Sequence, residues 1–138
     1  MTAMMTKLQT SSTVQRAPMR LRRVLVVDDN RDAADTLGAM LTFLGYEVRV
    51  AYDSEAGLEE ATSFEPDVAV WDISLPGVNG YEAARRLRAL REGRRVMLVA
   101  LTAHATPADR SAALAAGFDL HMKKPVDVNA LLMEIGCA

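Results

Sequence analysis

Short apolar runs alternate with amphipathic segments along the chain from residue 22 onward. Continuous runs rich in valine are typical of parallel strands that are buried on both faces. The segments between them repeat apolar residues every three or four positions, which predicts helices. The expected strands are residues 22–27, 46–51, 68–73, 96–101 and 120–122, and the expected helices are residues 31–44, 54–64, 81–91, 106–117 and 127–135.

Capping residues support these boundaries. Gly45 follows the first predicted helix, and Asp53 or Ser54 can cap the second. Thr106 followed by Pro107 is a typical start for the fourth. The helix positions expected to face the core include Ala34, Leu37, Leu41 and Leu44 in the first helix, and Ala84, Leu87 and Leu90 in the third.

Strand and helix alternate five times, which predicts an α/β fold with a five-stranded parallel sheet and helices on both faces. The 138 residues suffice for one compact domain. In such sheets ligands bind outside the carboxyl ends of the strands. Candidate chemistry is therefore expected at that edge.

Composition narrows the class of protein. Half of the residues are apolar, a quarter are charged and the net charge is −2, so no bulk charge attracts nucleic acid or an acidic membrane surface. The single cysteine, Cys137, cannot form an intrachain disulfide, and a reducing, cytoplasmic location is expected. The run of arginines after residue 84 is interpreted as a solvated helix face: Arg85, Arg86, Arg88, Arg91, Arg94 and Arg95.

The first residues differ from the rest, because residues 1–23 are basic, rich in Ser and Thr, and free of acidic side chains. Residues 1–20 are interpreted as a flexible tail or linker, with an organelle transit peptide as the alternative. The domain is predicted to span residues 21–138.

Polar residues follow four of the predicted strands. Asp28 and Asp29 follow the first, Asp72 ends the third, Thr102 the fourth and Lys124 the fifth. Converging carboxylates raise one another's pKa unless a cation neutralises them, and oxygen ligands without His or Cys suit Mg²⁺. A plainer alternative is that Asp28 and Asp29 only cap the next helix.

A carboxylate, a divalent metal, a hydroxyl and an ammonium around one point describe a phosphoryl-transfer site. Asp72, on the central strand, is the expected nucleophile, while the pair on the first strand suits the metal. Lys124 can pair with a phosphoryl oxygen, and Thr102 offers a hydroxyl. Ala103 is small enough to leave room above Asp72.

Four segments, in order, resemble the receiver domain of two-component response regulators, and together the resemblance covers about residues 22 to 136. They are VLVVDDN at 24–30, VAVWDISLPGVNGYE at 68–82, VALTAHA at 99–105 and GFDLHMKKPV at 117–126. The resemblance implies a CheY-like, flavodoxin-like (βα)5 fold. It also implies a phospho-accepting signalling domain and not an enzyme. The only reactions that such a domain carries out are its own phosphotransfer and autodephosphorylation.

The resemblance implies a role for each site residue. Asp72 accepts a phosphoryl group from a histidine of a partner kinase or a histidine phosphotransfer protein. Asp28 and Asp29 hold Mg²⁺ together with Asp72 and the main-chain carbonyl of Ser74. Thr102 moves to hydrogen-bond the phosphoryl group, and Lys124 pairs with it.

The main departure from the family lies at its switch position, where His121 replaces the usual Tyr or Phe. An imidazole is smaller and polar, so its coupling to Thr102 is expected to be weaker or to use a hydrogen bond. His104 and Ser74 occupy positions that tune dephosphorylation in this family. Residues 105–116, 120–122 and 127–134 form the face through which the family meets downstream partners.

Two other functions fit parts of the pattern. A phosphatase of the haloacid dehalogenase kind needs two aspartates two positions apart, whereas Asp28 and Asp29 are adjacent and Asn30 follows them. A pseudo-receiver that binds partners without phosphorylation is supported only by His121. The receiver itself can be a single-domain regulator or part of a hybrid histidine kinase.

Overall fold

The computed structural model describes residues 23–74, 79–90, 96–103 and 106–137. A single parallel sheet runs through the described part, in the order β3-β2-β4-β5-β6. The predicted α/β class and the five predicted strands are confirmed, with boundaries shifted by no more than one residue. The strands are β2 (Arg23–Val27), β3 (Glu47–Ala51), β4 (Val68–Asp72), β5 (Met97–Thr102) and β6 (Leu120–Lys123).

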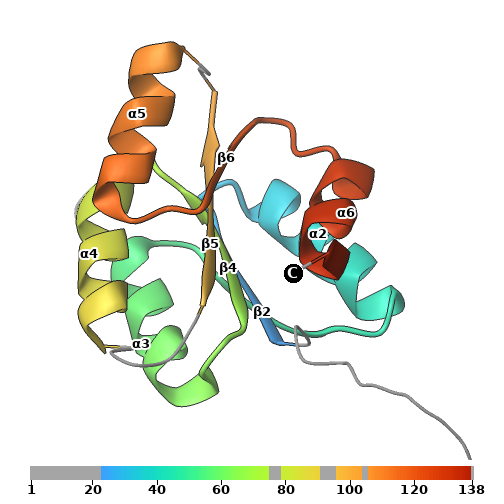
Figure 1. Cartoon of the computed structure of the whole chain (residues 1–138). Helices are drawn as coiled ribbons and strands as arrows, with labels where there is room; N and C mark the ends of the chain where they lie inside the picture. Colours follow the sequence, from blue (N-terminus) through green and yellow to red (C-terminus); the bar gives the residue numbers. More distant parts are fainter. Residues whose placement is uncertain (1–22, 75–78, 91–95, 104–105, 138) are drawn as a thin grey trace, which may run out of the picture.

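Helices cover both faces of the sheet. Figure 1 shows α2 and α6 on one side and α3, α4 and α5 on the other. This two-sided cover explains why the strands read as continuous apolar runs, because neither face of a central strand meets water. The helices are α2 (Arg31–Phe43), α3 (Ser54–Phe64), α4 (Gly80–Leu90), α5 (Pro107–Ala116) and α6 (Val128–Cys137).

The core has two halves, one on each side of the sheet. Along β2, Val24 and Val26 pack toward α2 and α6, while Leu25 and Val27 pack toward α3, α4 and α5. All four side chains are fully buried. Trp71 of β4 belongs to the second half and donates a hydrogen bond of 3.1 Å from its indole nitrogen to a buried serine of α3.

A side-chain cap begins each of the described helices, and Asn79 and Asp127 cap α4 and α6 by accepting from the amides of Glu82 and Ala130. Asn30 caps α2 by accepting from the amide of Ala33, and Asp53 caps α3. Thr106 and Asp109 form a reciprocal capping box at the start of α5. Because Asn30 caps α2, the alternative in which Asp28 and Asp29 serve only as its cap is wrong.

Two predicted core positions are also wrong. Leu44 is 49% exposed and Leu90 is 58% exposed. Leu44 is the C-cap of α2, so the chain has already left the helical path, and Tyr46 packs against the core instead. Leu90 is the last residue of α4, one turn beyond the buried Leu87.

None of the described helices is long and apolar enough to cross a membrane. Several sequence predictions lie outside the described residues: the tail at 1–20, His104, and the arginines at 91, 94 and 95.

Candidate functional site

The carboxyl edge of the sheet gathers the polar residues that were expected there. Asp28 follows β2, Asp72 ends β4, Thr102 ends β5 and Lys124 follows β6. The amide of Asp28 donates to the carbonyl of Ala51 at 3.1 Å, and the amide of Lys124 donates to the carbonyl of Thr102 at 2.7 Å. These main-chain bonds extend the strand ladders by one residue and fix where both side chains begin.

Lys124 bridges two buried carboxylates. Its Nζ lies 2.9 Å from Oδ2 of Asp72 and 3.3 Å from Oδ2 of Asp28. The two aspartates are only 1% and 3% exposed, so both charges are largely removed from water. One ammonium facing two carboxylates leaves an uncompensated negative charge at this edge, and the exposed Asp29 adds to it.

Asp72 is held as a carboxylate. Its Oδ1 accepts from the amide of Ser74 at 2.8 Å and from the Ser74 hydroxyl at 2.6 Å, while Oδ2 accepts from Lys124. Burial alone would raise the pKa of Asp72, but the hydrogen bonds from Ser74 and the charge of Lys124 outweigh it and lower that pKa. The residue is therefore ionised and oriented at neutral pH.

Asp28 is in a different electrostatic state. Burial raises its pKa, and the nearby charge of Asp72 adds to this effect. The amide of Asn30, 3.0 Å from Oδ1 of Asp28, and the charge of Lys124 oppose the shift without cancelling it. For Lys124, burial favours the neutral amine, but the two carboxylates prevail and raise its pKa. Asp28 thus carries a charge that the fold by itself leaves poorly compensated.

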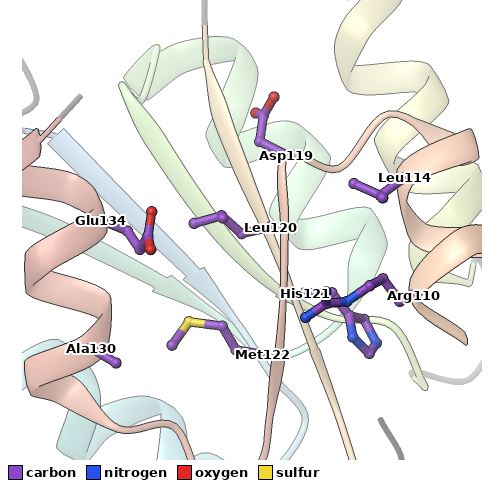
Figure 2. Close-up of a pocket in the computed structure, with 8 residues that line it drawn as sticks. All are labelled: Arg110, Leu114, Asp119, Leu120, His121, Met122, Ala130 and Glu134. Atoms are coloured by element: carbon purple, nitrogen blue, oxygen red, sulfur yellow. The ribbon is translucent and has the colours of Figure 1, made fainter. Parts of the chain in front are cut away.

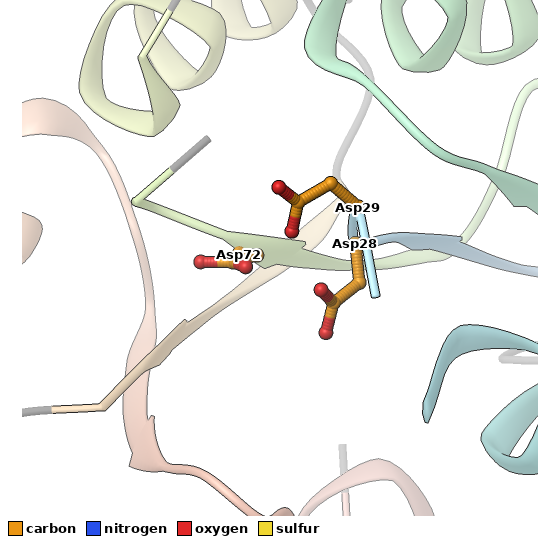
Figure 3. A group of neighbouring side chains, drawn as sticks. All are labelled: Asp28, Asp29 and Asp72. Carbon is orange, nitrogen blue, oxygen red and sulfur yellow. The ribbon is translucent and has the colours of Figure 1, made fainter. Parts of the chain in front are cut away.

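Three carboxylates are arranged as a metal could use them. Asp28, Asp29 and Asp72 each offer one oxygen, and these oxygens lie within 4.8 Å of one another. Figure 3 shows the three side chains gathered at the ends of β2 and β4. Oxygen donors alone, with excess negative charge, fit a hard divalent cation such as Mg²⁺.

Ser74 makes two contacts at the site that the sequence analysis did not predict. The sequence analysis assigned its main-chain carbonyl to the metal, and that role stays a prediction. The structure shows that its amide and its hydroxyl both donate to Asp72. The sequence pattern that could have predicted these contacts is a serine two positions after an aspartate, because such a side chain can fold back and donate a hydrogen bond to the carboxylate.

Arg88 was missed by the sequence analysis, which placed it on a solvated face. Its guanidinium donates to the carbonyl oxygens of Val96 and Gly117 and to the carboxylate of Asp119, all within 3.0 Å. Asp119 in turn accepts from the amide of Leu98 at 2.8 Å. Arg88 therefore ties α4 to the starts of β5 and β6, whereas Arg85 and Arg86 are exposed and pair with Glu82 on their own helix.

A groove of about 300 Å³ lies on the face built by α5, β6 and α6, called here the α5–β6–α6 face (residues 107–116, 120–123 and 128–137). Figure 2 shows the residues that line it: Arg110, Leu114, Asp119, Leu120, His121, Met122, Ala130 and Glu134. Its walls are mainly apolar, with charged groups from α5, from α6 and from the turn before β6. This face coincides with the one that the sequence analysis assigned to partners.

Comparison with known proteins agrees with this geometry. The family model described as "Response regulator receiver domain" matches residues 24–136. The response regulator MprA of Mycobacterium ulcerans is 38% identical over 113 residues, which are 82% of this chain and 48% of that protein. The chain thus spans about half the length of the curated relatives that it matches.

Solved structures give the same result. A CheY-like response regulator receiver domain protein from Methanospirillum hungatei has a TM-score of 0.76 and 32% identity, covering 85% of this chain and 92% of that one. The receiver domain of Ssk1, co-crystallised with the histidine phosphotransfer signalling protein Ypd1 of Saccharomyces cerevisiae, has a TM-score of 0.77 and 27% identity, covering 83% and 86%. The chain therefore belongs to the response regulator receiver domain family of two-component signalling.

Proposed function

We propose that Asp72 accepts a phosphoryl group from a phosphohistidine of a partner protein, with Mg²⁺ at Asp28 and Asp29, and that phosphorylation changes partner binding. The observation that carries the proposal is the state of Asp72. This carboxylate is buried and ionised, and Ser74 and Lys124 each bind one of its oxygens. The acidic pair Asp28 and Asp29 lies beside it.

The chemistry follows from what each side chain can supply. A carboxylate oxygen of Asp72 attacks phosphorus, the P–N bond to the donor imidazole breaks, and an acyl phosphate forms. The ammonium of Lys124, already 2.9 Å from Asp72, stabilises negative charge on the transferring oxygens. Asp72 lies opposite Leu101 in the β4–β5 register, which brings the hydroxyl of the next residue, Thr102, to the same edge as a donor.

The carboxylates of Asp28, Asp29 and Asp72 and the carbonyl of Ser74 would hold Mg²⁺. When bound, this ion would supply further positive charge to the phosphoryl oxygens. The same groups can orient water for hydrolysis of the acyl phosphate, which makes the signal self-limiting. In this proposal the domain acts only on its own phosphoryl group. The Ser74 hydroxyl, which binds Asp72 in the free state, must release it or shift during transfer.

The same observations do not support the phosphatase or the pseudo-receiver function. A phosphatase of the haloacid dehalogenase kind needs an acid/base group where Asn30 stands, and the Asn30 side chain is occupied in capping α2. A pseudo-receiver has no need of a buried carboxylate poised beside an ammonium. The family match places the chain among signalling domains.

The proposed partners are of two kinds. A histidine kinase or a histidine phosphotransfer protein supplies the phosphoryl group, and the Ssk1 receiver complex with Ypd1 supports this pairing by similarity. A downstream protein binds the α5–β6–α6 face, where His121 is the proposed switch residue together with Thr102. No direct contact with nucleic acid is proposed. In this proposal the exchange takes place in the cytoplasm, and the domain is either a single-domain regulator or the receiver of a hybrid histidine kinase.

The experiment uses a small phosphodonor, such as acetyl phosphate, with Mg²⁺, and counts phosphoryl groups by intact-protein mass spectrometry. One group is expected on the wild type and none on Asp72→Asn. Asp32→Asn, an exposed aspartate in the first turn of α2, is the matched control and should label normally. Labelling of Asp72→Asn, or labelling that continues in a metal chelator, contradicts the proposal.

A further inference from the structure

The proposed metal ligands are not held equally well. Asp28 and Asp72 are buried, and each accepts a hydrogen bond from a main-chain amide and another from Lys124. Asp29 is exposed, and within the described part of the chain no hydrogen bond or ion pair holds its carboxylate. The place of the Asp29 carboxylate therefore depends on how the main chain on either side of it is fixed.

The main chain before Asp29 is fixed to the end of β3. Val27, the last residue of β2, is paired with Ala51, the last residue of β3. The amide of Asp28 then donates to the carbonyl of Ala51 at 3.1 Å. Tyr52 follows Ala51 in the chain, so it leaves the sheet beside the segment that carries Asp29.

The main chain after Asp29 is fixed by the side chain of Tyr52. The guanidinium carbon of Arg31 lies 4.1 Å from the centroid of the Tyr52 ring. The Tyr52 hydroxyl donates to Oδ1 of Asp35 at 2.6 Å, and this hydrogen bond raises the pKa of the phenol, which stays protonated at neutral pH. Arg31 is the first residue of α2, and Asp35 lies one turn further along the same helix. One side chain at the end of β3 thus binds the start of α2 at two points.

The contacts of Tyr52 replace a more local one. Side chains of opposite charge four positions apart on a helix commonly pair with each other. Arg31 and Asp35 have these charges and this spacing, but in the described structure each contacts Tyr52 and no ion pair joins them. Tyr52 is half-buried and packs against the half of the core beneath α2 and α6. The start of α2 is therefore tied to a residue that the core holds in place.

We propose that Tyr52 is a positioning residue for the metal site. By holding Arg31 and Asp35 at the start of α2, it keeps the carboxylate of Asp29 in place to bind Mg²⁺. This role of Tyr52 rests on the proposed function, in which Asp29 is a metal ligand. A ligand that is already held in its binding position loses less conformational freedom when the metal binds, so the affinity for the metal is higher. Tyr52 itself supplies no ligand atom in this arrangement.

Isothermal titration with Mg²⁺ alone tests the effect on affinity. Tyr52→Leu removes both contacts and should weaken binding about tenfold, at the lower end of what the loss of a group that supports a metal ligand costs. Tyr52→Phe keeps the ring at Arg31 and loses only the hydrogen bond to Asp35, so its affinity should lie between those of the wild type and Tyr52→Leu. Should Tyr52→Leu not fold, Tyr52→Phe decides alone, and wild-type affinity in that variant overturns the proposal.

Tyr46→Leu is the matched control. Tyr46 is half-buried and packs against the same half of the core, but it lies just before the start of β3, at the opposite edge of the sheet. Its replacement removes a tyrosine from the same core half and should leave the affinity for Mg²⁺ unchanged. Equal losses of affinity in Tyr46→Leu and Tyr52→Leu would reveal a general effect of weakened packing and would overturn the proposal.

Amide relaxation measured by NMR on the metal-free protein tests the positioning itself. The order parameter of the Asp29 amide should be about 0.85, the value of rigid backbone, in the wild type and in Tyr46→Leu. In Tyr52→Leu it should fall toward about 0.6, the value that marks flexible backbone. An order parameter that is unchanged in Tyr52→Leu overturns the proposal, because the segment is then held by other contacts.

Asp29→Asn separates the role of Tyr52 from the proposed function. If Asp29→Asn binds Mg²⁺ as tightly as the wild type, Asp29 is not a ligand and the proposed metal site fails. If Asp29→Asn binds Mg²⁺ weakly while Tyr52→Leu binds it like the wild type, the metal site stands and only the role of Tyr52 is rejected.

Discussion

Lys124 and Asp72 are 52 positions apart in the chain, yet Nζ of the lysine lies 2.9 Å from Oδ2 of the aspartate. The contact exists because β4 and β6 flank β5 in one parallel sheet and end at the same edge. It joins the proposed nucleophile to the cation that stabilises its charge. The predictions below start from this pair.

Replacing Lys124 with Met should slow phosphorylation of Asp72 by roughly 100-fold, because a charge-stabilising donor is lost at the transferring oxygens. Stopped-flow or quenched-flow labelling with acetyl phosphate and Mg²⁺ measures the rate. Lys123→Met is the matched control, since Lys123 is exposed and makes no described contact with either aspartate. Equal rates in the two variants would show that Lys124 does not take part in the reaction.

The two buried aspartates should respond differently to neutralisation. Burial raises the pKa of Asp28, so its charged form is unfavourable in the fold, whereas contacts from Ser74 and Lys124 lower that of Asp72. In metal-free buffer near neutral pH, Asp28→Asn should raise the free energy of unfolding by about 1 kcal/mol. Asp72→Asn should raise it less or lower it. Urea unfolding with a chelator present gives both values, and the reverse order would contradict this electrostatic account.

The advantage of Asp28→Asn should depend on pH. An unfolded aspartate titrates near 3.9, and the folded pKa of Asp28 lies above that value. The penalty for its charge therefore appears as pH rises through this window and disappears as pH falls below it. Unfolding curves for the wild type and Asp28→Asn should converge near pH 4 and separate toward neutrality. A constant difference between them across this range would mean that some other effect of the substitution is measured.

Arg88→Ala should lower the free energy of unfolding by about 3 kcal/mol. The substitution leaves the carbonyls of Val96 and Gly117 and the carboxylate of Asp119 without their cation. Arg86→Ala, which removes an exposed arginine two positions away, should cost less than about 1 kcal/mol. Urea unfolding compares the two variants, and similar losses would show that the Arg88 contacts are not stabilising.

Magnesium should stabilise the wild type and not Asp29→Asn. A ligand at about 100 times its dissociation constant raises the free energy of unfolding by about 2.7 kcal/mol. Asp29 is exposed, so its loss should affect metal binding and leave the metal-free stability nearly unchanged. Thermal unfolding with and without Mg²⁺ tests both points. An equal response to Mg²⁺ in both proteins would exclude Asp29 as a ligand.

The sequence by itself determined the fold class and the edge at which chemistry gathers. Apolar runs such as Val24 to Val27 must be buried on both faces, and polar residues directly after them must lie at the strand ends. Caps such as Thr106 with Pro107 could be read locally, because their partners lie within one turn.

Only the tertiary structure decided how these groups are paired. Three contacts depend on which elements pack together. Arg88 donates to Asp119, and Ser74 donates twice to Asp72. By contrast, Nε2 of His121 is left without a partner. The same holds for Leu44 and Leu90, whose helical spacing suited the core but which lie at the ends of α2 and α4 and are exposed. Periodicity reports which face of an element is apolar, whereas burial and hydrogen bonding depend on neighbours that are distant in the chain.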